Sequence, residues 1–370
     1  MSTFATRLIR WQLRHGRHDL PWQRTRDPYR IWLSEVMLQQ TQVATVVPYF
    51  RRFLARFPNV GSLARAPLDE VLTLWSGLGY YSRARNLHAA AAKLLESGGG
   101  RFPRRREAIE TLPGVGRSTA AAIAVFAFGA REAILDGNVK RVLARHFAVR
   151  GVPGERPTEN RLWRIAESLL PSKNIRSYTQ ALMDLGATLC TRSLPACGQC
   201  PLEKTCRANA AGKTHAYPQP RRRKALPVRT ASLLLLLREG DVLLEKRPPA
   251  GVWGGLWCLP EIPPGEDPRD YCSRRWGTRL AEVARLPPVR HGFTHFILNI
   301  HPVVCRASPA SSLVSEPGQV SLPPEDAVRA AVPAPVRRLL AGLSAPGKPV
   351  SLAGGGETAT LQEPLQDRQP

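Results

Sequence analysis

The sequence predicts a mostly helical domain followed by a small α/β domain, and three observations carry this prediction. Apolar residues recur at helical spacing over residues 1–206, while strand-like patterns begin only after residue 228. Positive charge is also uneven, because residues 1–225 hold 37 Lys and Arg against 15 Asp and Glu, and residues 226–370 hold 16 against 14. With 370 residues, of which 43% are apolar, the chain is long enough to build two hydrophobic cores.

Helical periodicity predicts a series of helices in the first part, after an opening helix around Trp11 and Leu13. These helices are expected at Ile31–Gln42, Leu68–Trp75, Ala84–Leu95, Ala120–Phe128 and Val139–Phe147. We therefore expect a helical domain over residues 1–206. A polar linker with several prolines should follow over residues 207–228, and it includes the basic run Arg221–Lys224.

The pattern changes after the linker. Ser232–Arg238 and Val242–Lys246 flank a Glu-Gly-Asp turn and predict a β-hairpin, and Phe293–Val304 predicts a further strand. Arg269–Trp276 and Ala334–Leu343 are expected to be helical. Residues 229–343 are thus predicted to form an α/β domain, and residues 344–370, poor in aromatic residues, a disordered tail.

The strong positive charge of residues 1–225 indicates a polyanionic partner, since each phosphate that a cationic surface contacts releases counterions. An arginine-rich chain with solvated charged faces is the alternative, but it does not predict the asymmetry. No apolar run approaches the ~20 residues of a membrane span, so no membrane association is expected. Clustering of four of the seven cysteines within residues 190–206 favours a reducing compartment over a disulfide framework.

A candidate phosphate-binding turn lies between two helical segments. Leu112–Gly116 reads Leu-Pro-Gly-Val-Gly and is followed by Arg117-Ser118-Thr119. The residues Gly114, Val115 and Gly116 permit a tight turn whose backbone N–H groups, at the start of the second helix, face a phosphate. This pattern predicts a helix-hairpin-helix motif that binds DNA without reading its sequence. A plain helical turn is the alternative.

Two carboxylates are candidates for catalysis. Glu35 lies among apolar residues of a predicted helix, where burial should raise its pKa into the range of a general acid. Asp136 follows Gly116 by twenty residues, and this pairing of a hairpin with a downstream aspartate resembles the endonuclease III superfamily of DNA glycosylases, which implies that the carboxylate stabilises a positively charged sugar. The alternatives are a partly exposed helix glutamate and a helix N-cap aspartate, and capping is compatible with catalysis.

The four clustered cysteines, Cys190, Cys197, Cys200 and Cys206, have the spacing C-x6-C-x2-C-x5-C. This spacing resembles the 4Fe–4S loop of the endonuclease III superfamily of DNA glycosylases, which implies one structural 4Fe–4S cluster. Zinc is the alternative, but four-cysteine zinc sites usually contain two C-x2-C pairs. Arg192, between the first two cysteines, is placed to meet a DNA phosphate.

Several runs together resemble the adenine DNA glycosylases, the MutY family of that superfamily, over residues 18–206. They are Trp32–Gln42, Gly77–Leu87, the hairpin, Leu135–Val142 and the cysteine loop. The resemblance implies a substrate of double-stranded DNA with adenine opposite 8-oxoguanine or guanine. It implies that Glu35 protonates adenine, that Asp136 stabilises or traps the sugar cation, and that Asn138 positions these groups.

The resemblance also implies how the duplex is held. The residues expected to contact DNA, besides the hairpin and Arg192, are Gln39, Gln40, Leu78, Tyr80 and Ser118, of which Gln40, Leu78 and Tyr80 would enter the duplex on the 8-oxoguanine side. Bifunctional relatives carry a nucleophilic lysine where this chain has Ser118. Without that amine no Schiff base is expected, so the product should be an abasic site without efficient strand cleavage.

The second domain resembles the Nudix fold at Trp253–Pro260. Its helix near Asp270–Arg275 lacks the acidic R-E-x-x-E-E pattern that binds magnesium in Nudix hydrolases, so pyrophosphohydrolase activity is not expected. Phe293, Thr294 and His295 match the Phe-Ser-His loop that contacts 8-oxoguanine in the adenine glycosylases, with threonine keeping the hydroxyl group.

Three rival functions remain open at this point. They are an endonuclease III-like pyrimidine glycosylase and lyase, a nucleotide-pool hydrolase, and a non-enzymatic metal-containing DNA-binding module. The lack of a lysine at the position of Ser118 argues against the glycosylase and lyase. The lack of magnesium-binding acids in the Nudix-like helix argues against the nucleotide-pool hydrolase. The presence of Glu35 and Asp136 argues against a non-enzymatic module. We expect a monomeric, bacterial, cytoplasmic and nucleoid-associated enzyme.

Overall fold

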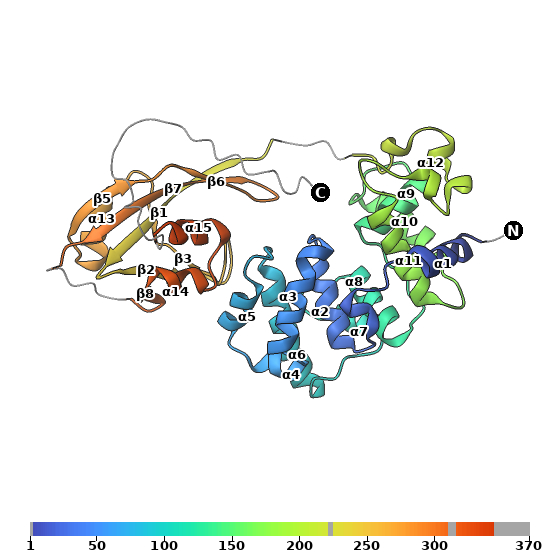
Figure 1. Ribbon diagram of the computed structural model, residues 1–370, viewed down its shortest axis with the longest axis horizontal. Helices are drawn as coiled ribbons and strands as arrows, with labels where there is room; N and C mark the ends of the chain where they lie inside the picture. The colour runs from blue at the N-terminus through green and yellow to red at the C-terminus, as the bar shows by residue number, and fades with distance from the viewer. Residues whose placement is uncertain (1–2, 221–224, 310–315, 344–370) are drawn as a thin grey trace. The chain divides into compact units, whose positions relative to one another are not determined.

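The computed structural model describes residues 3–220, 225–309 and 316–343 (Figure 1). It divides the chain into two compact units: unit 1 comprises Met1–Ala225 with Pro249–Leu256, and unit 2 comprises Leu226–Pro248 with Trp257–Pro370. The basic run 221–224 and the tail predicted over residues 344–370 lie outside the described residues. Each unit is described by itself below.

Unit 1 consists of helices joined by short turns. They are α1 (Phe4–His15), α2 (Pro28–Leu38), α3 (Val43–Arg56), α4 (Val60–Arg65), α5 (Leu68–Trp75), α6 (Ser82–Gly98), α7 (Arg106–Glu110), α8 (Arg117–Ile123), α9 (Gly137–His146), α10 (Arg156–Ser168), α11 (Ile175–Thr188) and α12 (Arg207–Ala210). The predicted helical domain is confirmed. The segment Ala120–Phe128 contains the end of α8 and a π-helical turn, Ala124–Phe128.

One predicted helix is shorter at its end than expected. The periodic run Ile31–Gln42 suggested a helix as far as Gln42, whereas α2 begins at Pro28 and ends at Leu38. The Asp27 side chain caps its first turn by accepting a hydrogen bond from the Tyr29 backbone N–H at 2.9 Å. Gln40 has a left-handed backbone, with φ of 55°, which is incompatible with continuing a right-handed helix.

One hydrophobic core of unit 1 joins helices from both ends of the sequence. Leu8 of α1, Leu143 of α9 and Leu185 of α11 are fully buried in it. A Cβ atom on Gly186 would lie 2.5 Å from Cβ of Asn138, so only glycine lets α11 approach the start of α9 this closely. The partly buried Cys190 and Cys200 pack against this same core.

Unit 2 is a mixed sheet with helices. Its strands are β1 (Val228–Arg238), β2 (Asp241–Lys246), β3 (Trp257–Cys258), β4 (Glu261–Ile262), β5 (Leu280–Arg285), β6 (Val289–Gly292), β7 (Ile297–Ala307) and β8 (Gln319–Leu322). The main strand order is β3-β2-β1-β7-β5, and β1 and β7 run parallel. The predicted hairpin is confirmed, because β1 pairs antiparallel with β2 through Arg238 and Asp241.

The prediction of one strand over Phe293–Val304 is wrong at both ends. β7 begins at Ile297 and continues to Ala307, while residues 293–296 connect it to the antiparallel strand β6. The backbone N–H of Phe293 donates to the Phe296 carbonyl at 2.8 Å, which closes a tight connection. The alternation of apolar residues alone did not reveal this turn.

Helices cover the sheet of unit 2. The consecutive residues Leu233–Leu237 of β1 are all buried, which requires cover on both faces because side chains alternate along a strand. Tyr271 and Trp276 of α13 (Pro268–Trp276) pack against one set of these leucines. The remaining helices are α14 (Pro324–Arg329) and α15 (Ala334–Leu343) (Figure 1). In the described ranges, no helix has the length and apolar composition needed to span a membrane.

Candidate active site

The first candidate carboxylate, Glu35, lies in the last turn of α2. The residue as a whole is half-buried, in a helix whose neighbouring residues Ser34 and Val36 are buried. Desolvation of its carboxyl group and, second, the negative charge of Asp136 raise the pKa of Glu35 to about 8. Glu35 therefore holds a proton at neutral pH and has the property that a general acid requires.

The second candidate, Asp136, is the N-cap of α9. Its Oδ1 accepts a hydrogen bond from the Val139 backbone N–H at 2.7 Å, and its Oδ2 lies 3.5 Å from the amide nitrogen of Asn138. Burial raises the pKa of Asp136, while the Val139 N–H and the nearby Arg141 oppose that rise. The predicted N-cap role of Asp136 is confirmed, and its negative charge also influences Glu35, so the cap leaves a catalytic role open.

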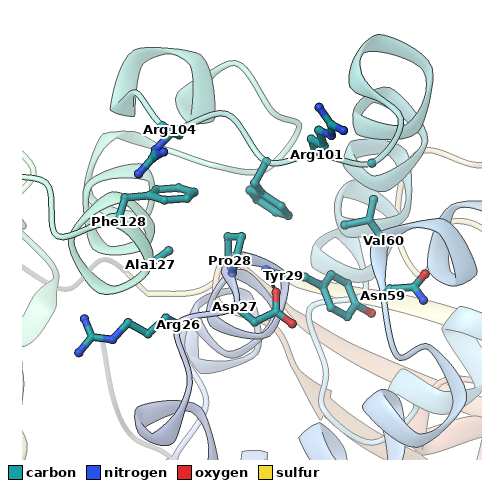
Figure 2. Close-up of a pocket in the computed structure, with 12 residues that line it drawn as sticks. Arg26, Asp27, Pro28, Tyr29, Asn59, Val60, Arg101, Arg104, Ala127 and Phe128 are labelled. Carbon is teal, nitrogen blue, oxygen red and sulfur yellow. Dashed lines mark hydrogen bonds between the residues drawn. The ribbon is translucent and has the colours of Figure 1, made fainter.

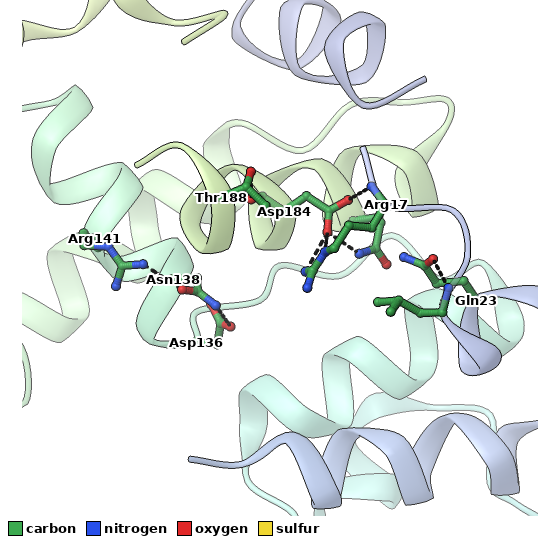
Figure 3. Close-up of polar contacts among 9 residues, drawn as sticks. Arg17, Gln23, Asp136, Asn138, Arg141, Asp184 and Thr188 are labelled. Atoms are coloured by element: carbon green, nitrogen blue, oxygen red, sulfur yellow. Dashed lines mark hydrogen bonds and ion pairs between the residues drawn. The ribbon is translucent and has the colours of Figure 1, made fainter. Parts of the chain in front are cut away.

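Arg141 holds this arrangement from one side. Its Nη2 donates to Asn138 Oδ1 at 2.7 Å and to the Gly186 carbonyl at 2.6 Å, and its Nε donates to the Cys190 carbonyl at 2.7 Å. Figure 3 shows the contacts that run from Arg141 through Asn138 to Asp136. Arg141 therefore connects the cysteine loop, through the Cys190 carbonyl, to Asn138 and so to Asp136.

The hairpin adopts the tight geometry expected of it. Gly114 has φ of 74°, and a Cβ atom there would lie 2.7 Å from Cβ of Asn86, so this position requires glycine. Val115 is buried, while Gly116 is exposed as the N-cap of α8. Exposed N–H groups at that helix start suit a phosphate.

Ser118 connects the hairpin to the aspartate segment. Its Oγ accepts a hydrogen bond from the backbone N–H of Leu135, the residue before Asp136, at 2.9 Å. In the same helix, Thr119 Oγ1 lies 3.5 Å from Nε2 of Gln39. The hydroxyl of Ser118 thus has a defined structural partner that sequence reasoning did not identify.

The residues expected to enter the duplex differ in exposure. Gln40 is exposed and Tyr80 is 45% exposed, and both have positive φ, at 55° and 47°. Leu78, in contrast, is only 5% exposed. Its backbone N–H donates a hydrogen bond to the Trp75 carbonyl at 3.0 Å.

The four clustered cysteines satisfy the chemistry of a thiolate-bound group. All four are half-buried free thiols, and Arg145 Nη1 lies 3.4 Å from Cys190 Sγ. Burial, followed by the neighbouring thiols Cys190 and Cys206, raises the pKa of Cys197, so these groups lie within electrostatic range of one another. Within the described residues, no three His, Cys, Asp or Glu side chains converge on a site for a single ion.

A cavity of about 560 Å³ lies away from the two carboxylates. It is lined by residues that include Pro28 at the start of α2, Phe102, Arg104 and Phe128, and neither Glu35 nor Asp136 lines it (Figure 2). Figure 2 shows Arg104 beside the Phe128 ring, and its Cζ atom is 5.4 Å from the ring centre. This cavity sits at the end of α2 opposite to Glu35, so we do not assign the chemistry to it.

Comparison with known proteins places this geometry in a family. The HhH-GPD superfamily of base excision DNA repair proteins matches residues 33–168, and the NUDIX domain matches residues 232–342. The chain is 37% identical over 313 residues to the adenine DNA glycosylase of Buchnera aphidicola, covering 85% of this chain and 89% of that protein. The chain belongs to the adenine DNA glycosylase family. It is therefore an enzyme of the class that hydrolyses N-glycosyl bonds in DNA.

Other relatives agree with this membership. The human adenine DNA glycosylase is 35% identical over 362 residues, covering 80% of this chain and 66% of that protein. A solved structure of a thermostable thymine-DNA glycosylase is 32% identical, with a TM-score of 0.51, and covers 56% of this chain and 95% of that chain. The fold predicted for both parts of the chain, helix-hairpin-helix followed by Nudix-like, is confirmed.

In the Nudix-like unit, α13 carries an arginine in an ion-pair cluster. Arg275 Nη2 lies 2.6 Å from a carboxylate oxygen of Glu245 and 2.8 Å from one of Glu316.

The tip of the β6–β7 connection exposes two polar residues. Thr294 and His295 are exposed there, and the Phe293 ring stacks on the Phe296 ring at 4.4 Å between ring centres. Thr294 Oγ1 and His295 Nδ1 lie 3.3 Å apart, within hydrogen-bond distance of each other, and both side chains face solvent.

Sequence reasoning missed a fully buried acid in unit 1. Asp184 of α11 has no exposed surface, and its Oδ1 accepts from Arg17 Nε at 2.7 Å and from Gln180 Nε2 at 2.9 Å (Figure 3). The amide nitrogen of Gln23 is also buried and has no hydrogen-bond partner among the described residues. The signal that identified Glu35, a charged residue inside an apolar helical run, would also have identified Asp184.

Proposed function

We propose that this enzyme excises adenine mispaired with 8-oxoguanine, and with guanine, from duplex DNA and leaves an abasic site. The observation that carries the proposal is the position of Glu35 in the last turn of α2, between the buried Ser34 and Val36, where desolvation and the charge of Asp136 raise its pKa to about 8. Adenine leaves poorly unless it is protonated, and a purine offers N7 for this purpose. A buried acid therefore suits a purine substrate, and the names of the relatives support adenine as that purine.

The proposed mechanism gives the two carboxyl groups different roles. Glu35 donates its proton to N7 as the glycosidic bond breaks, and Asp136 stabilises the positive charge that develops on the sugar. Asn138, held by Arg141, orients the aspartate. Because Ser118 provides no amine, no Schiff base forms there, and water completes the hydrolysis without strand cleavage.

The DNA contacts that we propose follow from exposure and charge. The N–H groups around Gly114–Gly116 and the exposed Arg192 meet phosphates, and Gln40 and Tyr80 enter the duplex on the 8-oxoguanine side. Three further residues of these segments are at least half-buried, so we propose that they mainly support the residues that contact DNA. They are Gln39, Val115 and Ser118. Leu78 would reach the duplex only if its loop moved on binding.

The proposed reader of the lesion is the connection between β6 and β7. Thr294 and His295 are exposed at its tip, and the stacked Phe293 and Phe296 rings support it. A hydroxyl group both donates and accepts hydrogen bonds, which matches the altered edge of 8-oxoguanine. We further propose that the enzyme works as a monomer on the chromosome in a bacterial cytoplasm, in keeping with its bacterial relatives.

We propose that Cys190, Cys197, Cys200 and Cys206 hold one 4Fe–4S cluster with a structural role. When bound, the cluster joins the cysteine loop to the core that contains α9 and α11. Arg145, only 3% exposed, donates to the Thr191 carbonyl at 2.6 Å and would orient the first cysteine of the loop.

Metal analysis tests this assignment. The purified protein is expected to be brown and to contain four irons and four sulfides per chain, and Cys197→Ala is expected to lose both the colour and the iron. The control is Cys258→Ala, which removes a buried thiol of unit 2 and should keep the iron. A colourless protein with one zinc per chain would overturn the cluster.

The function itself is tested with duplexes that contain 8-oxoguanine:A, G:A or thymine glycol:A. Strand breaks at the adenine of the first two duplexes are expected only after alkali treatment, because an abasic site is alkali-labile. Direct nicking at thymine glycol with adenine untouched would instead assign the chain to the endonuclease III type of reaction.

A further inference from the structure

Arg83, in the first turn of α6, connects two loops that are separated in the sequence. The first, called the Gln40 loop, comprises residues 39–42, and the second, called the Tyr80 loop, comprises residues 77–81. Arg83 is only 7% exposed, and its guanidinium donates to six oxygen atoms in or beside these two loops. They are the carbonyls of Val36 (3.1 Å), Met37 (2.8 Å), Gln39 (2.6 Å), Leu78 (3.1 Å) and Gly79 (3.1 Å), and Oγ1 of Thr41 (3.1 Å).

The chemistry of arginine explains why one side chain serves both loops. Carbonyls in the last turn of a helix have no partner within the helix and favour a cation, so Arg83 stabilises the end of α2. Its planar fork directs Nη1 toward the Gln40 loop and Nη2 mainly toward the Tyr80 loop. Burial lowers the pKa of Arg83 to about 10, which leaves it charged at neutral pH.

A second observation comes from the backbone. Gln40 and Tyr80 both hold left-handed conformations, which side chains other than glycine rarely adopt and which cost free energy. Each of these residues lies next to an acceptor of Arg83, namely Gln39 and Gly79. Arg83 Cζ also lies 5.4 Å from the centre of the Tyr80 ring. The strained conformations persist where one buried cation fixes the neighbouring carbonyls.

We propose that Arg83 is a positioning residue that holds Gln40 and Tyr80 as one unit and thereby sets the preference for 8-oxoguanine over guanine opposite adenine. The inference rests on the proposed function, in which these two side chains enter the duplex. Arg83 itself is too buried to touch DNA, so it acts through the two loops. Its loss should impair recognition of the opposite base more than the chemical step at Glu35 and Asp136.

The test compares Arg83→Lys with Arg176→Lys in the full-length holoenzyme. Arg176 also donates to backbone carbonyls, those of Val125, Phe126 and Ala127, but it contacts neither loop in the described structure. Single-turnover excision is measured on 8-oxoguanine:A and G:A duplexes, together with the Tm. Arg83→Lys should lower the ratio of the two rates by about tenfold or more, because displacement of positioning groups is costly. Arg176→Lys should lower the Tm and leave the ratio unchanged.

Hydrogen exchange on the free proteins gives a readout that does not depend on activity. In Arg83→Lys, residues 39–42 and 77–81 should lose protection together, while the hairpin at residues 112–116 keeps it. Loss of protection in one loop alone, or an unchanged rate ratio despite a lower Tm, would overturn the inference. If the wild-type enzyme excises adenine from neither duplex, the proposed function fails. If it excises adenine equally fast from both, the proposed function stands and the inference about Arg83 is overturned.

Discussion

Replacing Glu35 with glutamine is expected to slow adenine excision by about 10²- to 10⁴-fold, the range that a positioned proton donor contributes. Glutamine keeps the shape of the protonated acid but has no proton to give to N7. The measurement is the single-turnover rate on an 8-oxoguanine:A duplex at saturating enzyme. The matched control is Glu70→Gln, which alters a half-buried glutamate of α5 paired with Arg56 and should leave the rate unchanged.

The excision rate of the wild-type enzyme should depend on whether Glu35 is protonated. With a pKa of about 8, Glu35 stays protonated through neutral pH, and the excision rate should fall as the pH rises through about 8. The pKa of Glu35 is higher in the folded protein than in the unfolded chain. Between about pH 4.5 and 8 the folded protein therefore binds a proton that the unfolded chain lacks. The contribution of Glu35 to the free energy of unfolding consequently falls as the pH rises in that window. Glu35→Gln should therefore be at least as stable as wild type at pH 8. A rate that stays constant to pH 9.5 would contradict the role of Glu35.

Replacing Asp136 with asparagine is expected to slow excision by about 10²- to 10³-fold, the effect of removing one preorganised electrostatic partner of the transition state. Asparagine is also a good N-cap, so the bond from the Val139 N–H survives and α9 keeps its start. Asp136→Ala should lose the same activity and, in addition, about 1 kcal/mol of stability from the missing cap. Comparing the two variants separates the charge from the cap.

The control for this comparison is another capping aspartate in the same unit. Asp27 caps α2 by accepting from the Tyr29 N–H at 2.9 Å, and it lies at the end of that helix opposite to Glu35. Asp27→Asn should retain nearly full activity. Equal losses from Asp27→Asn and Asp136→Asn would mean that the effect comes from the helix start and not from a carboxylate at the sugar.

The sequence was sufficient for features that depend on local patterns. Leu68–Trp75 is apolar at helical spacing and forms α5 over the same residues, and the Glu-Gly-Asp turn separates β1 from β2 as expected. Burial of Glu35 followed from its apolar neighbours. The two glycines of the hairpin likewise indicated a turn that a side chain at Gly114 would obstruct.

Features that depend on distant residues were not predictable in this way. The end of α2 at Leu38 is set by Gln40 and by Arg83, which lies on a different helix, so local periodicity carried the predicted helix too far. Burial of Leu78 depends on the same tertiary contacts. Arg141 and Asp184 acquire their partners only when α9, α11 and the segment around Arg17 come together.

The central claim, that Glu35 protonates adenine at N7, is tested most directly by changing the acceptor in the DNA. Single-turnover excision and binding are measured with adenine and with 7-deazaadenine, in which a C–H group replaces N7, each opposite 8-oxoguanine. The account predicts similar binding of both duplexes and excision of 7-deazaadenine at least about 10²-fold slower than adenine. Equal rates of excision would contradict it, because the proton of Glu35 would then not be needed at N7.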